Sequence, residues 1–200
     1  MALSLSNSGG GNSKGYMGNG IYVDEVEIKK ASDVTEQEKS SGFDRDVSIK
    51  LEVLVLKNDW ERTVTIGGNY KRDPITKEVL DWGGAFKLKD LFVACGMTDE
   101  DVQEGLSANG IPSSDLLAGC IGKKIKTLTY TNINTTSDKL KYSTWNSVTS
   151  AGRDSANFAE YFMSQVAKGY PKNYKAPNSE AQPVKESIAK AVSSVSTEAL

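Results

Sequence analysis

Aromatic and basic residues recur close together along the middle of this 200-residue chain. Flat side chains stack on nucleic-acid bases of any identity, and lysine and arginine attract the phosphates between those bases. Together they predict a surface that binds single-stranded nucleic acid with little sequence preference. The candidate binding residues, which lie near the ends of predicted strands, are Trp60, Arg62, Tyr70, Lys71, Arg72, Lys123, Lys124, Lys126, Tyr130, Lys141, Tyr142 and Trp145.

Several of these residues have a packing alternative. Trp60 could close the end of a barrel instead of stacking on a base, and Trp82 directly precedes a helical segment, which favours a core position. Tyr142 and Trp145 are three residues apart, so a regular strand points them to opposite faces and one of them belongs to the core. The cations of residues 123–126 could serve only to keep an exposed sheet edge from pairing.

The sequence has no histidine, and this argues against most enzyme classes. Histidine is the commonest general base and the commonest metal ligand, so Ser-His and Cys-His hydrolases are excluded and a structural zinc site is disfavoured. The acidic residues at 99–101 leave a metal-dependent nuclease formally open, but acids in the first turn of a helix need no metal. We therefore expect a binding protein with no catalytic residues, no cofactor and no metal.

Five strands and a helical insert are predicted between residues 20 and 150. Residues 47–55 alternate apolar and polar positions most clearly, and residues 20–28 alternate with a break of one residue that would fit a bulge. Residues 63–70, 124–130 and 140–148 supply the other strands, whereas residues 32–42 are predicted as a loop. Leu88, Leu91, Phe92 and Cys95 have helical spacing and end at Gly96, and a second short helix begins near Thr98.

A helix between strands three and four is the order of an OB-fold, a small barrel that binds oligonucleotides near strands two and three. The expected fold is mainly β: a five-stranded OB-like barrel with a helical insert between strands 3 and 4 and a helix after strand 5. That last helix starts at Asp154 or Ser155 and buries Phe158, Tyr161 and Phe162. The expected organisation is a flexible Gly/Ser arm (1–19), the barrel (20–150), a helix with a basic and aromatic linker (151–175) and a flexible tail (176–200).

Short motifs in this layout resemble phage-type single-stranded DNA-binding proteins with an OB-fold. They are Gly20-Ile21-Tyr22, Lys50-Leu51-Glu52-Val53, the helix that ends at Ala94-Cys95-Gly96, Gly122-Lys123-Lys124-Ile125, and the late pair Tyr142 and Trp145. The resemblance covers about residues 20–150. It implies a protein that coats single-stranded DNA during replication, recombination or repair, with replication or recombination proteins as partners. Members of this family often end in an acidic tail, whereas this tail balances three glutamates with two lysines.

Charge, cysteine content and hydropathy add weaker expectations. The formal net charge of −2 argues against DNA binding by bulk positive charge but allows a local basic groove. Cys95 and Cys120 are expected to be free thiols in a reducing compartment, with a disulfide as the alternative. No apolar run approaches the length of a membrane span, so a cytoplasmic location is expected, in the host cell if the gene is phage-borne. The alternative function is a phage structural or assembly protein that does not bind nucleic acid. Self-association into a homo-oligomer is left open.

Overall fold

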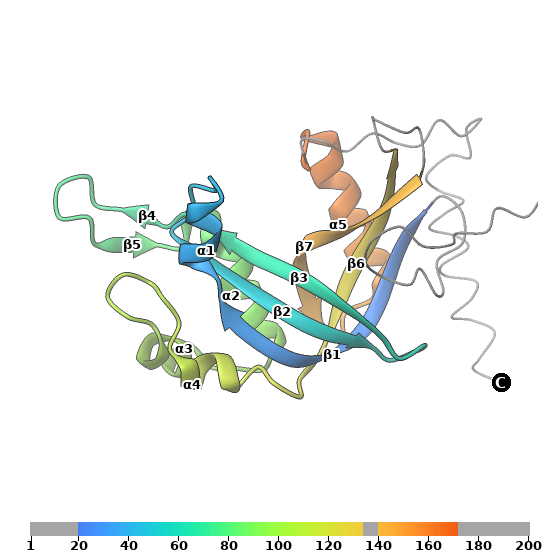
Figure 1. Cartoon of the computed structure of the whole chain (residues 1–200), viewed down its shortest axis with the longest axis horizontal. Coiled ribbons are helices and arrows are strands. Elements are labelled where there is room, and N and C mark those ends of the chain that lie inside the picture. The colour runs from blue at the N-terminus through green and yellow to red at the C-terminus, as the bar shows by residue number, and fades with distance from the viewer. Residues whose placement is uncertain (1–19, 134–139, 172–200) are drawn as a thin grey trace, which may run out of the picture.

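A five-stranded antiparallel sheet curls into a nearly closed barrel in the computed structural model, which describes residues 20–133 and 140–171 (Figure 1). The strands are β1 (Ile21–Asp33), β2 (Val47–Val55), β3 (Trp60–Gly68), β6 (Lys124–Ile133) and β7 (Leu140–Ser150), in the order β3-β2-β1-β6-β7. The two outer strands, β3 and β7, contact each other across the remaining gap. The predicted mainly β, OB-like barrel is confirmed.

Strand β2 forms as its alternating pattern predicts. Every odd position from Val47 to Val55 is buried, whereas Lys50 and Glu52 point outward. Strand β1 differs from the prediction, because its register with β6 is regular from Ile21 to Glu27 and the bulge comes later, between Ile28 and Lys30. The early break in alternation has another cause. The strand is covered on both faces, so that Ile21 packs outward while Val26 is buried in the barrel.

The helical insert closes one end of the barrel. It contains η1 (Gly83–Ala85), α2 (Phe86–Ala94), α3 (Asp99–Gly105) and α4 (Ser114–Ala118). Helix α2 buries Leu88, Leu91 and Phe92 and ends before Gly96, whose φ of 78° is in the region that favours glycine. At α3, Thr98 and Asp101 form a capping box, in agreement with the helix-start interpretation of the acidic residues there.

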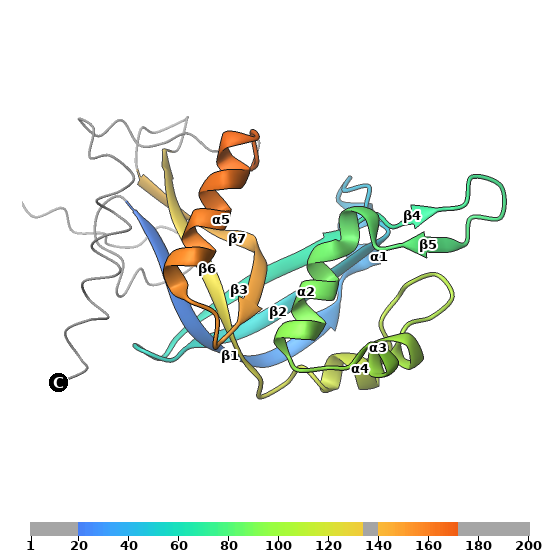
Figure 2. The same ribbon diagram turned by 180° about the vertical axis from the view of Figure 1, so that it is seen from behind.

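The second covering element is α5 (Ser155–Ala167), which lies on the outer face of β6 and β7 (Figure 2). The side chain of Asp154 accepts a hydrogen bond from the backbone N–H of Asn157 and so caps the helix, as predicted. Phe158 and Phe162 are buried against Trp145 of β7. Two hydrophobic clusters therefore hold the fold together, one inside the barrel and one beneath α5.

One segment predicted as a loop, residues 32–42, contains a helix, and a hairpin follows β3. The polar residues after β1 form α1 (Thr35–Ser40), and residues after β3 form a hairpin of β4 (Lys71–Arg72) and β5 (Val79–Asp81), which projects away from the barrel (Figure 1). Cys95 and Cys120 are buried, free thiols. Within the described residues, no helix has the length and apolar character needed to cross a membrane. The predicted arm at 1–19 and tail at 176–200 lie outside the described residues.

Candidate nucleic-acid interface

Three of the predicted stacking residues are buried in the core. Trp145 is only 4% exposed and lies under α5, and Tyr130 stacks on Phe162 with ring centroids 5.0 Å apart. The hydroxyl of Tyr70 donates to the carbonyl oxygen of Gly110 (2.7 Å), and burial raises the pKa of Tyr70 well above its ordinary value. Of the pair Tyr142 and Trp145, the tryptophan is therefore the core member. Neither Trp145 nor Tyr130 presents a ring face on which a base could stack.

Arg62 lies inside the barrel and not at its surface. It is opposite the buried Val53, so the register of β3 directs its side chain inward, where it is 6% exposed. The guanidinium donates to Oδ2 of Asp24 (3.2 Å), to Oγ1 of Thr129 (2.5 Å) and to Oγ1 of Thr127. In this position Arg62 neutralises a buried carboxylate, and a phosphate outside the barrel cannot reach it.

Trp60 and Tyr142 are half-buried at their strand starts. The turn between β2 and β3 ends at Asp59, so Trp60 is the first residue of β3 and packs against the barrel core. The ring of Tyr142 lies 6.3 Å from the ring of Tyr22 across the inner face of the barrel. The placement of Trp60 agrees with the barrel-closing alternative.

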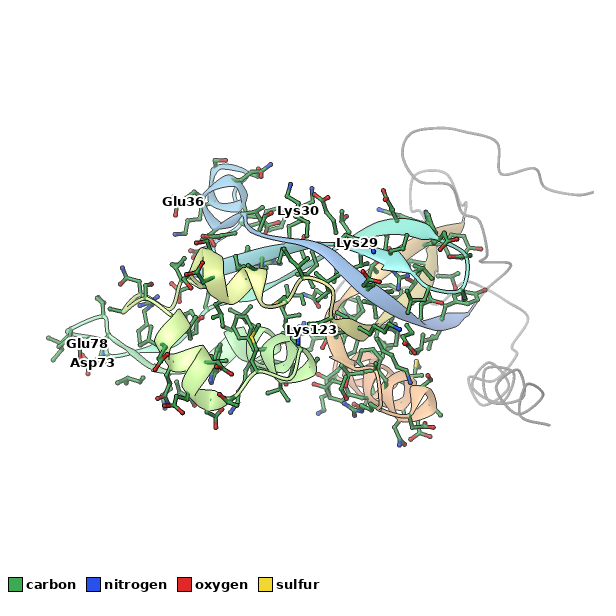
Figure 3. All side chains as sticks on the ribbon, turned by 90° about the horizontal axis from the view of Figure 1, so that it is seen from below. Lys29, Lys30, Glu36, Asp73, Glu78 and Lys123 are labelled. Atoms are coloured by element: carbon green, nitrogen blue, oxygen red, sulfur yellow. The ribbon has the colours of Figure 1, made fainter. Side chains whose placement is uncertain are left out.

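The predicted cations do not gather on one surface. In the strand register, Lys124 of β6 is opposite Glu27, and Lys141 of β7 is opposite Asn132 of β6. Asn132 is eight residues beyond Lys124, so the two lysines are about 27 Å apart along the sheet at 3.4 Å per residue. Lys123 lies beside the bend of β1 near Lys29 and Lys30, away from the β4–β5 hairpin (Figure 3).

Of the remaining predicted cations, Arg72 and Lys126 have protein partners and Lys71 is exposed. Arg72 forms an ion pair with Asp46 (3.2 Å) and donates to two backbone carbonyl groups, and Lys126 donates to the carbonyl oxygen of Arg153 (2.5 Å). Lys71 is exposed at the base of the hairpin.

A site that the sequence interpretation missed lies on the outer face of β2 and β3, next to α1. Phe43 is 51% exposed there, and the guanidinium of Arg45 lies 5.4 Å from the centre of its ring. Lys50 of β2 is directly opposite Thr65 of β3. Phe43, Lys50 and Thr65 line a hollow of about 140 Å³, here called the α1 hollow, together with Val34, Gln37, Glu38 and Ser41; Arg45 lies beside it.

The lining of the α1 hollow contains one acidic residue, Glu38, and one basic residue, Lys50. Glu38 accepts from Arg45 (3.0 Å) and from the hydroxyl of Ser48 (3.1 Å). Lys50 forms no ion pair with any residue that the structure describes. A phosphate could therefore approach Lys50 without displacing an acidic partner. The sequence signal for this site was a single aromatic residue, Phe43, within an otherwise polar segment that was predicted as a loop.

Lys87 of α2 adds a cation beside this end of the barrel. Its Nζ donates to Oδ1 of Asn146 (2.6 Å) and lies 5.8 Å from the ring centre of Trp145. Burial lowers the pKa of Lys87 to about 8, and the positive charge of Arg45 acts in the same direction. Lys87 of α2 and Arg45, in the loop that carries Phe43, are therefore close enough for their positive charges to repel each other.

Two comparisons of the sequence with known proteins found no match. The sequence matches no protein-family model and no curated protein.

Proposed function

We propose that this protein binds single-stranded DNA on the outer face of β2 and β3, with the α1 hollow as its central contact. One base stacks on Phe43, while Lys50, which forms no ion pair with a described residue, contacts a neighbouring phosphate. The protein would act without catalysis and would coat single strands during replication, recombination or repair.

The observation that carries this proposal is the place of an exposed aromatic residue on an OB-like barrel. OB-folds bind oligonucleotides at strands two and three and at the loop between strands one and two. Phe43 lies in that loop, and Lys50 lies on strand β2. Stacking on an aromatic ring accepts any base, so this arrangement supports binding with little sequence preference.

Salt dependence of oligonucleotide binding tests the proposal. Each phosphate contact on a single strand contributes about −0.7 to the slope of log K against log salt, so the Lys50 contact alone accounts for a slope of about −0.7. Fluorescence anisotropy of a labelled oligothymidine with the full chain should show binding at low salt and a slope at least this steep. Absence of binding at low salt would overturn the proposal.

A second candidate function, a phage structural or assembly protein, is favoured by the β4–β5 hairpin. Ile75 near its tip is 88% exposed, and Leu80 is also exposed. Apolar side chains on a projecting hairpin suit a contact with another protein. Sedimentation velocity would favour this function if defined oligomers form, if Ile75→Ser dissociates them, and if oligothymidine does not bind.

A further inference from the structure

A second cavity lies on another part of the surface, between α2, the end of β7 and α5. Figure 2 shows the two helices on the same side of the barrel with β7 between them. The cavity has a volume of about 400 Å³, within the range of small-ligand sites. Its lining includes Phe86, Asp90, Thr149, Arg153, Phe158 and Tyr161.

Asp90 faces this cavity, where burial raises its pKa more than the positive charges of Arg153, Lys89 and Lys87 lower it. Its carboxylate is half-buried, yet within the part of the chain that the structure describes it accepts no hydrogen bond and forms no ion pair. Burial raises the pKa of Asp90, because the charged form is poorly solvated there. This carboxylate can accept hydrogen bonds from a ligand that carries N–H groups, because no described protein group donates to it.

Arg153 faces the same cavity without an ion pair to Asp90. Its guanidinium lies 5.9 Å from the ring centre of Phe158 and 5.8 Å from that of Tyr161, and it makes one long hydrogen bond to Thr149 (3.5 Å). Phe86, on the other wall, is 40% exposed. One cavity thus offers an acceptor, a forked donor and aromatic side chains.

These groups match the chemistry of a flat ring with donors on one edge and acceptors on another. Guanine has N–H donors at N1 and N2, which suit a carboxylate, and acceptors at O6 and N7, which suit a guanidinium. Thymine has only one N–H donor, and adenine and cytosine have only one amino group. We propose that this cavity binds one guanine base, which the single strand of the proposed function would supply.

Mononucleotide binding tests this inference apart from the proposed function. Isothermal titration of the full chain with dGMP, dAMP, dCMP and dTMP should show dGMP binding about 5-fold to 150-fold more tightly than the other three, the discrimination typical of one bidentate base contact. Equal affinities for all four, a preference for another base, or no binding would overturn it.

Variants locate the site. Asp90→Asn keeps the side-chain shape and removes the buried charge, so it should fold and should lose the dGMP preference; Arg153→Gln should weaken dGMP binding as a second, independent variant. Lys71→Ala, which removes an exposed lysine at the base of the β4–β5 hairpin, is the matched control and should bind dGMP like the wild type. Retention of the dGMP preference in both Asp90→Asn and Arg153→Gln would overturn the assignment to this cavity.

The DNA-binding proposal and the guanine-site proposal can be refuted independently. Oligothymidine contains no guanine, so Asp90→Asn should leave its affinity unchanged, and Phe43→Ala should leave dGMP binding unchanged. Binding of dGMP without oligothymidine binding would overturn the proposed function and retain the guanine site. The reverse result would retain the proposed function and overturn the guanine site.

Discussion

Replacement of Arg62 by alanine should destabilise the barrel without a selective effect on DNA binding. The side chain of Asp24 is completely buried, and Arg62 is one of two cations beside it. Removing one partner of a buried ion pair costs about 3–5 kcal/mol, because a charge remains in a poorly solvated place. Lys57 stays 2.5 Å from Asp24 and is half exposed, so we expect the lower end, about 3 kcal/mol.

Urea and thermal unfolding measure this loss. For a domain of this size, about 3 kcal/mol corresponds to a fall of roughly 6–12 °C in Tm. Lys57→Ala is the matched control: it removes the more exposed cation from the same carboxylate and should cost less than Arg62→Ala. Oligothymidine affinity, measured below the Tm of each variant, should stay close to that of the wild type. A loss of stability under about 1 kcal/mol, combined with a large loss of DNA affinity, would refute the structural role of Arg62 and indicate that it contacts DNA.

Three further predictions concern the α1 hollow and the cation of α2. Phe43→Ala should weaken oligothymidine binding by about 1–3 kcal/mol, the value of one stacked base, with little change in Tm. Ile75→Ala on the hairpin is the control for loss of an exposed apolar side chain. Equal oligothymidine affinities in the two variants would count against stacking on Phe43. Lys50→Ala should reduce the salt slope of binding by about 0.7, whereas Lys89→Ala should not change it. Lys87→Met should raise Tm at pH 7. The pKa of Lys87 is about 8 in the folded protein and higher in the unfolded chain, so the unfolded state binds more protons between these two values. The wild type should therefore become more stable as the pH rises from about 8 to 10.5. Lys87→Met should lack this gain in stability.

Local patterns were sufficient to predict the elements of the barrel. The alternation along residues 47–55 and the helical spacing that ends at Gly96 depend on each segment alone, and both formed as expected. The cap at Asp154 is equally local. The order of these elements then restricted the fold to an OB-like barrel, since a helix between strands three and four is characteristic of that fold.

Whether a given side chain points into the core or toward solvent depends on contacts between segments that are distant in the sequence. Arg62 points inward because β3 pairs with β2 in one register, and its partner Asp24 is 38 residues earlier in the chain. Trp145 and Tyr130 are buried because α5 covers the outer face of β6 and β7, which no pattern within those strands indicates. Phe43 was missed for the opposite reason: its exposure follows from the position of α1, in a segment whose polarity favours a loop.

The most direct test of the binding face is a residue-resolved NMR titration of the full ¹⁵N-labelled chain with oligothymidine. The account predicts that the largest chemical-shift changes occur at Phe43, Arg45, Lys50 and Thr65, and that Arg62 and Trp145 change little. Oligothymidine binding whose shift changes avoid the α1 hollow and concentrate elsewhere on the barrel would contradict it.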